Sequence, residues 1–205
     1  MSITEPGKME IALILFQSKL VSKSRYRVFV ERMDLSGSEK VLDFGAGWGE
    51  NTRYLAMRLD KGGEVTALDI SVKWQEVARR RLSAFTNVTY VNSDIRSSGL
   101  PKDRFDVIVI SNVLHDIPKS ERAEVTRELV NRLVSGGSIY LRERTGRNHG
   151  MPIEEIRLLM KECGMEESFS KAGRNTFLAT YRKRTLPPGK KRDTGAPSRR
   201  ESGPW

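Results

Sequence analysis

The segment Val41-Leu-Asp-Phe-Gly-Ala-Gly-Trp-Gly49 constrains the fold more than any other part of this chain. An apolar run meets an acid and is followed by three glycines at alternate positions. The pattern predicts a strand that enters a tight loop, where glycines admit positive φ angles and let a ligand approach the backbone. The helix expected from about residue 49 then directs free N–H groups and its positive end at the same crevice.

The spacing of the glycines narrows the choice of ligand. A phosphate loop would need Gly-x-x-x-x-Gly-Lys-Ser/Thr, and no such segment occurs. A dinucleotide fingerprint, Gly-x-Gly-x-x-Gly, fits Gly45 and Gly47 but places its third position on Glu50. A pyrophosphate at this turn would meet the carboxylates of Asp43 and Glu50, which is unfavourable. A cationic ligand, such as one with an ammonium and a sulfonium group, suits the turn better.

Further acids follow the next expected strands. The strand expected at 64–69 ends in Asp69, and Asp94 follows the strand expected at 88–92. A near-continuous apolar run at 105–111 is typical of a strand buried on both faces. In open α/β sheets ligands bind outside the carboxyl ends of the strands. Asp43, Asp69 and Asp94 are therefore expected to border one ligand crevice.

These segments, with Ser111-Asn-Val-Leu-His-Asp116 and Leu133-Val-Ser-Gly-Gly-Ser-Ile-Tyr-Leu141, resemble the ordered motifs of class I S-adenosylmethionine-dependent methyltransferases. The resemblance covers about residues 40–143 and is strongest to members that act on small molecules; Ser135 stands where proline is common. It implies S-adenosylmethionine as cofactor, with Asp43 near its amino-acid end, Asp69 at the ribose and Asp94 at the adenine. The implied cofactor-binding residues are Asp43, Gly45, Ala46, Gly47, Gly49, Asp69, Ile70, Asp94, Ile95, Ser111 and Asn112.

The alternation of strands and helices predicts an α/β fold: a Rossmann-like three-layer sandwich around a mostly parallel seven-stranded sheet. A hairpin at Ala172-Gly-Arg-Asn175 makes one strand near the C-terminus antiparallel. The expected strands are 40–44, 64–69, 88–92, 105–111, 138–143, 166–171 and 175–182. The expected helices are 9–31, 49–60, 71–84, 118–134, ended by Gly136 and Gly137, and one from Pro152 to before Gly164.

We expect three parts in the chain: an N-terminal helical lid (1–35), the S-adenosylmethionine-binding domain (36–184) and a disordered basic tail (185–205). The net charge of +10 is unevenly distributed. Residues 182–205 hold eight Lys/Arg and two acids, a net charge of +6, which leaves +4 for the other 181 residues. The tail could thus attract nucleic acid, or it could be a solubilising terminus.

His115, after the fourth expected strand, is the candidate general base. Tyr26, His115, Glu143 and Arg144 are candidates for binding the acceptor, and the ring of Trp74 could cover the base or ribose of the cofactor. His149 lies in a glycine-flanked loop and is a weaker candidate. We expect methyl transfer by in-line displacement to a small molecule. Two alternatives stay open: an RNA or protein methyltransferase tethered by the tail, and a non-catalytic S-adenosylmethionine-binding protein.

Cysteine usage and hydropathy indicate the cellular setting. The single cysteine, Cys163, excludes a disulfide framework and a cysteine-cluster metal site, and we expect no metal. No stretch approaches 18 apolar residues, and no secretory signal is evident. We therefore expect a cytoplasmic protein without a membrane span. The sequence does not indicate an oligomeric state.

Overall fold

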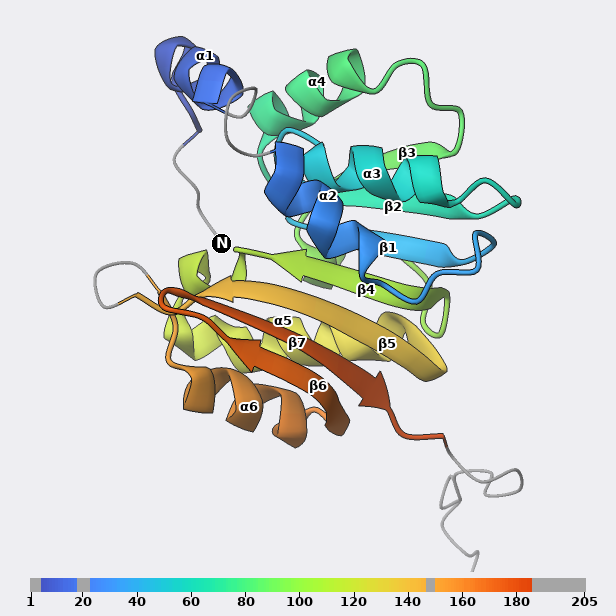
Figure 1. Cartoon of the computed structure of the whole chain (residues 1–205), viewed down its shortest axis with the longest axis vertical. Helices are drawn as coiled ribbons and strands as arrows, with labels where there is room; N and C mark the ends of the chain where they lie inside the picture. Colours follow the sequence, from blue (N-terminus) through green and yellow to red (C-terminus); the bar gives the residue numbers. More distant parts are fainter. Residues whose placement is uncertain (1–4, 18–22, 147–149, 186–205) are drawn as a thin grey trace, which may run out of the picture.

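A seven-stranded sheet with the order β3-β2-β1-β4-β5-β7-β6 organises the molecule. The computed structural model describes residues 5–17, 23–146 and 150–185. β7 runs antiparallel to both of its neighbours, β5 and β6, as its arrow shows in Figure 1. The expected α/β fold with one antiparallel strand is confirmed. The strands are β1 (Lys40–Phe44), β2 (Glu64–Asp69), β3 (Val88–Asn92), β4 (Phe105–Ser111), β5 (Leu133–Arg144), β6 (Met165–Ala172) and β7 (Thr176–Lys183).

Six α-helices occur in the part of the chain that the structure describes, and none of them is long and apolar enough to span a membrane. Ser71 caps α4, because its hydroxyl accepts a hydrogen bond from the Trp74 backbone N–H at 3.2 Å. The helices are α1 (Lys8–Gln17), α2 (Lys23–Glu31), α3 (Glu50–Arg58), α4 (Val72–Arg81), α5 (Lys119–Arg132) and α6 (Ile153–Glu162). Short 3₁₀ turns, η2 (Ile95–Ser97) and η3 (Leu114–Asp116), follow β3 and β4.

Side chains that alternate along the strands build a separate core on each face of the sheet. Val107 and Val109 of β4 join Phe29 and Val30 of α2 and Leu55 of α3 in one core. On the other face, alternate apolar residues of the same strand pack against α5 and α6. The sheet is therefore the middle of three layers, and the carboxyl ends of its parallel strands remain for a site.

Two expectations about element boundaries are wrong. The single helix expected at 9–31 is described as two helices, with residues 18–22 outside the described part. Leu13 and Phe16 of α1 are 57% and 63% exposed. Apolar residues follow one another without interruption from position 11 to 16. One buried face cannot cover such a run. Figure 1 shows α1 set apart from the sheet.

The start of β5 also differs from the expectation. The helix before it ends at Arg132, and Gly136 and Gly137 lie inside the strand rather than ending the helix. The pairing register jumps from Phe105 opposite Leu133 to Val107 opposite Ser138, so the intervening residues of β5 bulge out of the ladder. Such a bulge suits glycines, since it needs unusual backbone angles.

Candidate active site

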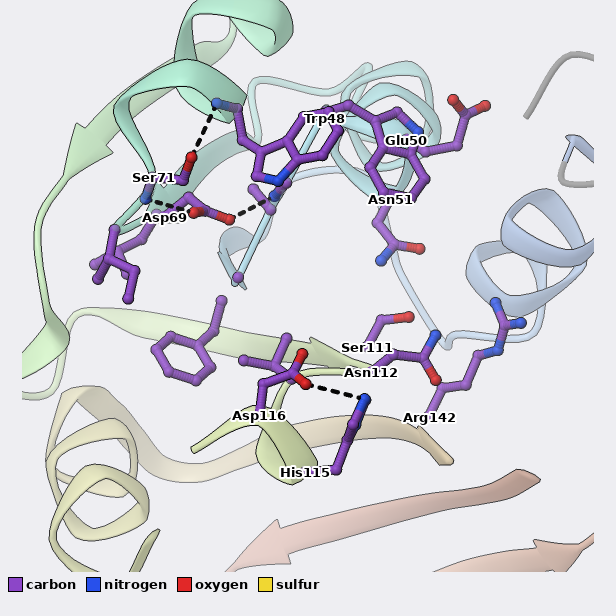
Figure 2. Close-up of a pocket in the computed structure, with 18 of the residues that line it drawn as sticks. Trp48, Glu50, Asn51, Asp69, Ser71, Ser111, Asn112, His115, Asp116 and Arg142 are labelled. Carbon is purple, nitrogen blue, oxygen red and sulfur yellow. Dashed lines mark hydrogen bonds and ion pairs between the residues drawn. The ribbon is translucent and has the colours of Figure 1, made fainter. Parts of the chain in front are cut away.

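A cavity of about 1250 Å³ lies at the carboxyl ends of the parallel strands. The segments after β1 to β4 and the end of β5 line it, and α1 and α2 contribute Ile14 and Tyr26. Figure 2 shows Asp69 and Ser71 at one end of this pocket and Arg142 at the other. Pockets for one drug-sized ligand usually measure about 300–1,000 Å³. This pocket therefore has room for a nucleoside cofactor together with a small second ligand.

The loop between β1 and α3 passes close to the segment after β4. A Cβ atom on Gly45 would lie 2.4 Å from Val113 Cγ2. The backbone N–H groups of Gly45 and Ala46 both donate to the carbonyl of Leu68, at 2.9 and 3.0 Å. A side chain on Gly49 would likewise meet α4, with Leu82 Cδ1 2.8 Å from its Cβ. These two glycines let the loop pack tightly between its neighbours.

Gly47 has a different role in the loop. It lines the pocket, and no atom lies within 4 Å of the position of its missing Cβ. Its φ angle of +53° is one that side-chain-bearing residues rarely adopt. Its backbone N–H donates to Asp69 Oδ2 at 2.7 Å. Gly47 therefore presents bare backbone to the cavity, where a ligand could lie against it.

Asp43 lies beneath this loop and is 1% exposed. Its Oδ2 accepts a 2.6 Å hydrogen bond from Thr52 Oγ1, while its Oδ1 has no hydrogen-bond partner among the described residues. Burial raises the pKa of the carboxyl to about 7, with the charge of Asp69 adding to the increase and Thr52 opposing it. Asp43 is not among the residues that line the cavity. Its expected contact with the cofactor stays a prediction.

Asp69 and Asp94 both line the pocket, as the strand-end pattern led us to expect. Asp69 accepts backbone N–H groups from Gly47 and Ser71, and burial raises its pKa. Asp94 is held differently, since the guanidinium of Arg96 donates to both of its carboxylate oxygens. That hydrogen bonding lowers the pKa of Asp94. Ile70 and Ile95, which follow these acids, also line the pocket.

Ser111 and Asn112, at the end of β4, line the opposite wall of the cavity (Figure 2). The Ser111 hydroxyl oxygen is buried and has no hydrogen-bond partner in the described part of the chain. Asn112 has a φ angle of +56°, and its backbone N–H donates to the carbonyl of Arg142 at 2.8 Å. This turn ends β4 sharply and leads directly to His115.

His115 and Glu143 form a hydrogen-bonded pair. His115 Nδ1 lies 2.5 Å from Glu143 Oε1, and His115 Nε2 lies 3.4 Å from Asp116 Oδ1. The hydrogen bond to Glu143 raises the pKa of His115, and burial opposes the increase. His115 lines the pocket with a side chain that is 6% exposed.

Glu143 is fully buried and does not line the pocket, although we expected it to bind substrate. Its carboxylate also accepts the backbone N–H groups of Val113, Leu114 and Arg144, at 3.2, 2.8 and 2.9 Å. These bonds tie the end of β5 to the segment after β4. Glu143 thus holds His115 in place from behind the pocket wall.

Arg142 was not among the residues singled out from the sequence, yet it lines the pocket beside Arg144. Its guanidinium lies over the ring of Tyr26, 5.1 Å from the centroid. Side chains alternate along a strand, so Arg142 and Arg144 project from the same face of β5 while Glu143 projects from the other. That alternation was the signal in the sequence that could have identified Arg142.

Two more lining residues, Trp48 and Asn51, were also missed. The Trp48 ring contacts the rings of Tyr26 and Trp74, with centroids 6.2 and 5.5 Å apart. Trp74, the expected cover for the cofactor, therefore belongs to an aromatic group at the pocket wall. His149 and the tail from residue 186 lie outside the described residues.

The pocket suits S-adenosylmethionine in shape and in chemistry. Bare backbone at Gly47 gives a ligand close approach, and the carboxylate of Asp69 borders the cavity. Within the described residues, Trp48 Nε1, Asn51 Oδ1 and Ser111 Oγ are buried without hydrogen-bond partners. Buried polar atoms normally have partners. A polar ligand in the cavity would supply them.

Comparisons with known proteins agree with this geometry. Residues 41–137 match the family described as a methyltransferase domain. A ubiquinone/menaquinone biosynthesis C-methyltransferase from Pectobacterium carotovorum is 28% identical over 57% of this chain and 47% of its own length. An rRNA adenine N-6-methyltransferase from Bacillus licheniformis is 29% identical over 58% of this chain and 39% of its own length. The chain thus matches less than half the length of these relatives.

A solved structure gives the same fold. The 1,6-didemethyltoxoflavin-N1-methyltransferase from Burkholderia thailandensis, with bound 1,6-didemethyltoxoflavin and S-adenosylhomocysteine, has a TM-score of 0.66. It is 17% identical, and the alignment covers 90% of this chain and 93% of that one. Fold, strand-end residues and family match together show that this chain contains a class I S-adenosylmethionine-dependent methyltransferase domain.

Proposed function

We propose that the chain transfers the methyl group of S-adenosylmethionine to a small molecule, with His115 as the general base. The observation that carries this proposal is the part-buried hydrogen bond between Glu143 and His115 at the pocket wall. The cofactor supplies an activated methyl group on a sulfonium that is already a good leaving group. The protein must therefore hold the acceptor in line and keep it in its nucleophilic form.

In this proposal the residues on the β1–β3 side hold the cofactor. Asp69 accepts hydrogen bonds from the ribose hydroxyls, and Asp94 with Ile95 contacts the adenine. The loop from Gly45 to Gly49, with Ala46, Ser111 and Asn112, surrounds the amino-acid end. The lining of the cavity supports these assignments, since it contains Asp69, Asp94, Ile95 and residues 45–48 of the loop, although not Gly49.

His115 removes the proton of the acceptor through Nε2. Nδ1 is engaged by Glu143, which fixes the orientation of the ring. Asp116 Oδ1, 3.4 Å from Nε2, stabilises the imidazolium that forms. General-base catalysis of this kind contributes about 10²- to 10⁴-fold.

We further propose that residues 1–35 act as a lid over a domain formed by residues 36–184. Ile14 of α1 and Tyr26 of α2 line the same cavity as the glycine loop. A cavity of about 1250 Å³ closed in this way favours an acceptor of small-molecule size. The biosynthetic C-methyltransferase among the relatives agrees with such an acceptor.

Turnover of radiolabelled S-adenosylmethionine with an extract of the source cells tests the proposal. We expect the label in the small-molecule fraction, and about 10²-fold less of it with His115→Ala, because the base is lost. Label in RNA or in protein would contradict the small acceptor. Cofactor binding without any labelled product would instead favour a non-catalytic binding protein.

One observation supports an RNA acceptor as the alternative. A relative is named as an rRNA methyltransferase, and the basic tail could act as an electrostatic tether. However, the segment after β4 lacks the Asn/Asp-Pro-Pro-Tyr/Phe pattern typical of amino-group methylation on adenine. The small acceptor therefore remains the better supported of the two.

A further inference from the structure

Arg142 is a half-buried cation without an anionic partner among the described residues. In the described part of the chain its side chain forms no ion pair, and its Nη1 is buried without a hydrogen-bond partner. Its guanidinium lies over the Tyr26 ring. Such stacking fixes the plane of the guanidinium group but satisfies none of its N–H donors. Figure 2 shows this side chain at the edge of the pocket, beyond Asn112.

Five acids line the pocket, and none of them pairs with Arg142 in the described part of the chain. Glu10 accepts the Gly7 backbone N–H at 3.4 Å, and Asp116 Oδ1 lies 3.4 Å from His115 Nε2. Glu50 pairs with Arg81 at 2.6 Å, and Asp94 pairs with Arg96 at 2.7 Å. Asp69 accepts the two backbone N–H groups described above. Because these carboxylates bind other groups, they do not balance the charge of Arg142.

Two further arginines reinforce the positive charge near Arg142. Arg25 of α2 and Arg144 of β5 line the same pocket. Burial lowers the pKa of Arg142, the Tyr26 hydroxyl opposes that decrease, and the charges of Arg25 and Arg144 add to it. A guanidinium stays protonated in proteins. This end of the cavity therefore carries an uncompensated positive charge that an anion would stabilise.

The position of Arg142 in the sheet indicates that its ligand is the methyl acceptor rather than the cofactor. The strand order reverses between β1 and β4, and cofactors in such sheets bind at that switch point. Asp69 and Asp94 lie on the β2–β3 side of it, whereas Arg142 lies on β5, two strands away from β1. His115, the proposed base, comes from the segment between these two ends.

We propose that Arg142 binds a carboxylate or phosphate group of the methyl acceptor and thereby selects anionic acceptors. The inference rests on the proposed function in naming the ligand as the acceptor. An anion would form charge-assisted hydrogen bonds with the unpaired N–H groups of the guanidinium. The Tyr26 ring fixes the plane of the Arg142 guanidinium. The charges of Arg25 and Arg144 strengthen the positive electrostatic potential around it.

Binding of simple probes tests this inference without turnover. The full chain is saturated with S-adenosylhomocysteine and titrated with benzoate, phenyl phosphate and the neutral benzyl alcohol, by calorimetry and ligand-observed NMR. We expect at least one anion to bind at least about tenfold more tightly than the alcohol, and Arg142→Met to remove that difference. Arg80→Met, an exposed arginine on α4, is the matched control and should change nothing. Equal binding of anions and alcohol by the parent chain would overturn the inference.

A second measurement distinguishes a carboxylate of the acceptor at Arg142 from the carboxylate of the cofactor's amino-acid end. We expect Arg142→Met to bind S-adenosylhomocysteine within about twofold of the parent chain. A tenfold loss of that affinity, with anion binding unchanged, would assign Arg142 to the cofactor's own carboxylate and overturn the inference. Should the methionine variant melt early, Arg142→Lys replaces it, since lysine keeps the charge but loses the fork. Unchanged benzoate and phenyl phosphate binding in that variant would also overturn the inference.

The extract assay distinguishes this inference from the proposed function. Anion binding that depends on Arg142, without any labelled product, supports the anion site and contradicts the methyl transfer. A labelled small molecule that is neutral and does not bind to an anion-exchange resin supports the methyl transfer and overturns the anionic acceptor. A labelled product that the resin retains supports both.

Discussion

Asp43 connects the sequence motif to the stability of the molecule. Its carboxyl is buried under the glycine loop, with Oδ1 unpaired within the described residues and a pKa of about 7. The unfolded chain has a value of about 3.9. Between these two values the native state binds the proton more tightly than the unfolded chain does. The contribution of Asp43 to the free energy of unfolding is therefore present at low pH and is lost as the pH rises from about 4 to 7.

We expect Asp43→Asn to flatten the dependence of stability on pH. The difference in free energy of unfolding between pH 4 and pH 8 should shrink by up to about 4 kcal/mol, the linkage limit for three pKa units. Urea unfolding at several pH values, without cofactor, measures it. Asp60→Asn, at an exposed aspartate, is the control. An unchanged slope in the Asp43 variant would show that the carboxyl is ionised in the native state.

The His115–Glu143 pair predicts a specific pH profile. His115 acts as a base only when neutral, so kcat/KM should rise with pH through a pKa above the ordinary value of 6.5. Glu143→Gln removes the charge that raises this pKa. In this variant the pH at which kcat/KM rises should move lower. The plateau of kcat/KM at high pH should fall about tenfold or more, because the base is weaker. A variant that loses activity without that shift in pH would indicate a purely structural role for Glu143.

Among the elements, the loop between β1 and α3 is expected to govern cofactor binding. Gly47→Val adds a β-branched side chain at a φ of +53°, inside the space of the pocket. We expect it to weaken S-adenosylhomocysteine binding at least about tenfold while the fold persists, as measured by calorimetry and circular dichroism. Gly62→Val matches it, since Gly62 has a φ of +84° and open space around its missing Cβ but does not line the pocket. Equal affinity in both variants would contradict the assignment of the loop.

The segment before α1 is attached to α4 through Glu5. The Glu5 carboxylate accepts hydrogen bonds from Ser71 Oγ at 2.6 Å and from the Val72 backbone N–H at 2.9 Å. These contacts place a negative charge at the N-terminus of α4, where it is favourable. Hydrogen bonding to Ser71 accordingly lowers the pKa of Glu5.

We expect Glu5→Ala to loosen the attachment of this segment. Amide hydrogen exchange of residues 5–17 and of the first turn of α4 should become about fivefold faster, the effect of losing roughly one net hydrogen bond. Glu76→Ala, at an exposed glutamate of α4, should leave the exchange unchanged. If both variants exchange at the same rate as the parent, Glu5 does not hold the segment.

The elements that could be predicted from the sequence are those with strong local patterns. β1, β2, β3 and β4 begin and end where their apolar runs and strand-end acids placed them. The bulge in β5 could not be predicted, because it depends on pairing with β4, which is distant in the chain. The same holds for the site, where Glu143 pairs with a histidine 28 positions away. Residue type alone could not show that Glu143 faces inward and Arg142 faces the pocket.

For the whole molecule, the distribution of charge separates the two classes of acceptor. The tail from 185 to 205 holds five Lys/Arg and two acids. We expect a chain that ends at Arg184 to keep its S-adenosylhomocysteine affinity and its small-molecule product within about twofold. Its binding to RNA should weaken, with a smaller dependence on salt, since fewer phosphate contacts form. Loss of the labelled product on truncation would favour the tethered RNA or protein acceptor.

The contact between Gly45 and Val113 also limits how such a molecule can be re-engineered. The Val113 methyl groups fill the volume that a side chain at position 45 would need, and Val113 also donates its N–H to Glu143. A segment grafted after β4 to admit a new acceptor would inherit that steric fit. A bulkier residue at 113 would displace the glycine loop, and a smaller one would leave a void beneath it. A design that changes which acceptors the protein methylates must therefore also preserve its affinity for the cofactor.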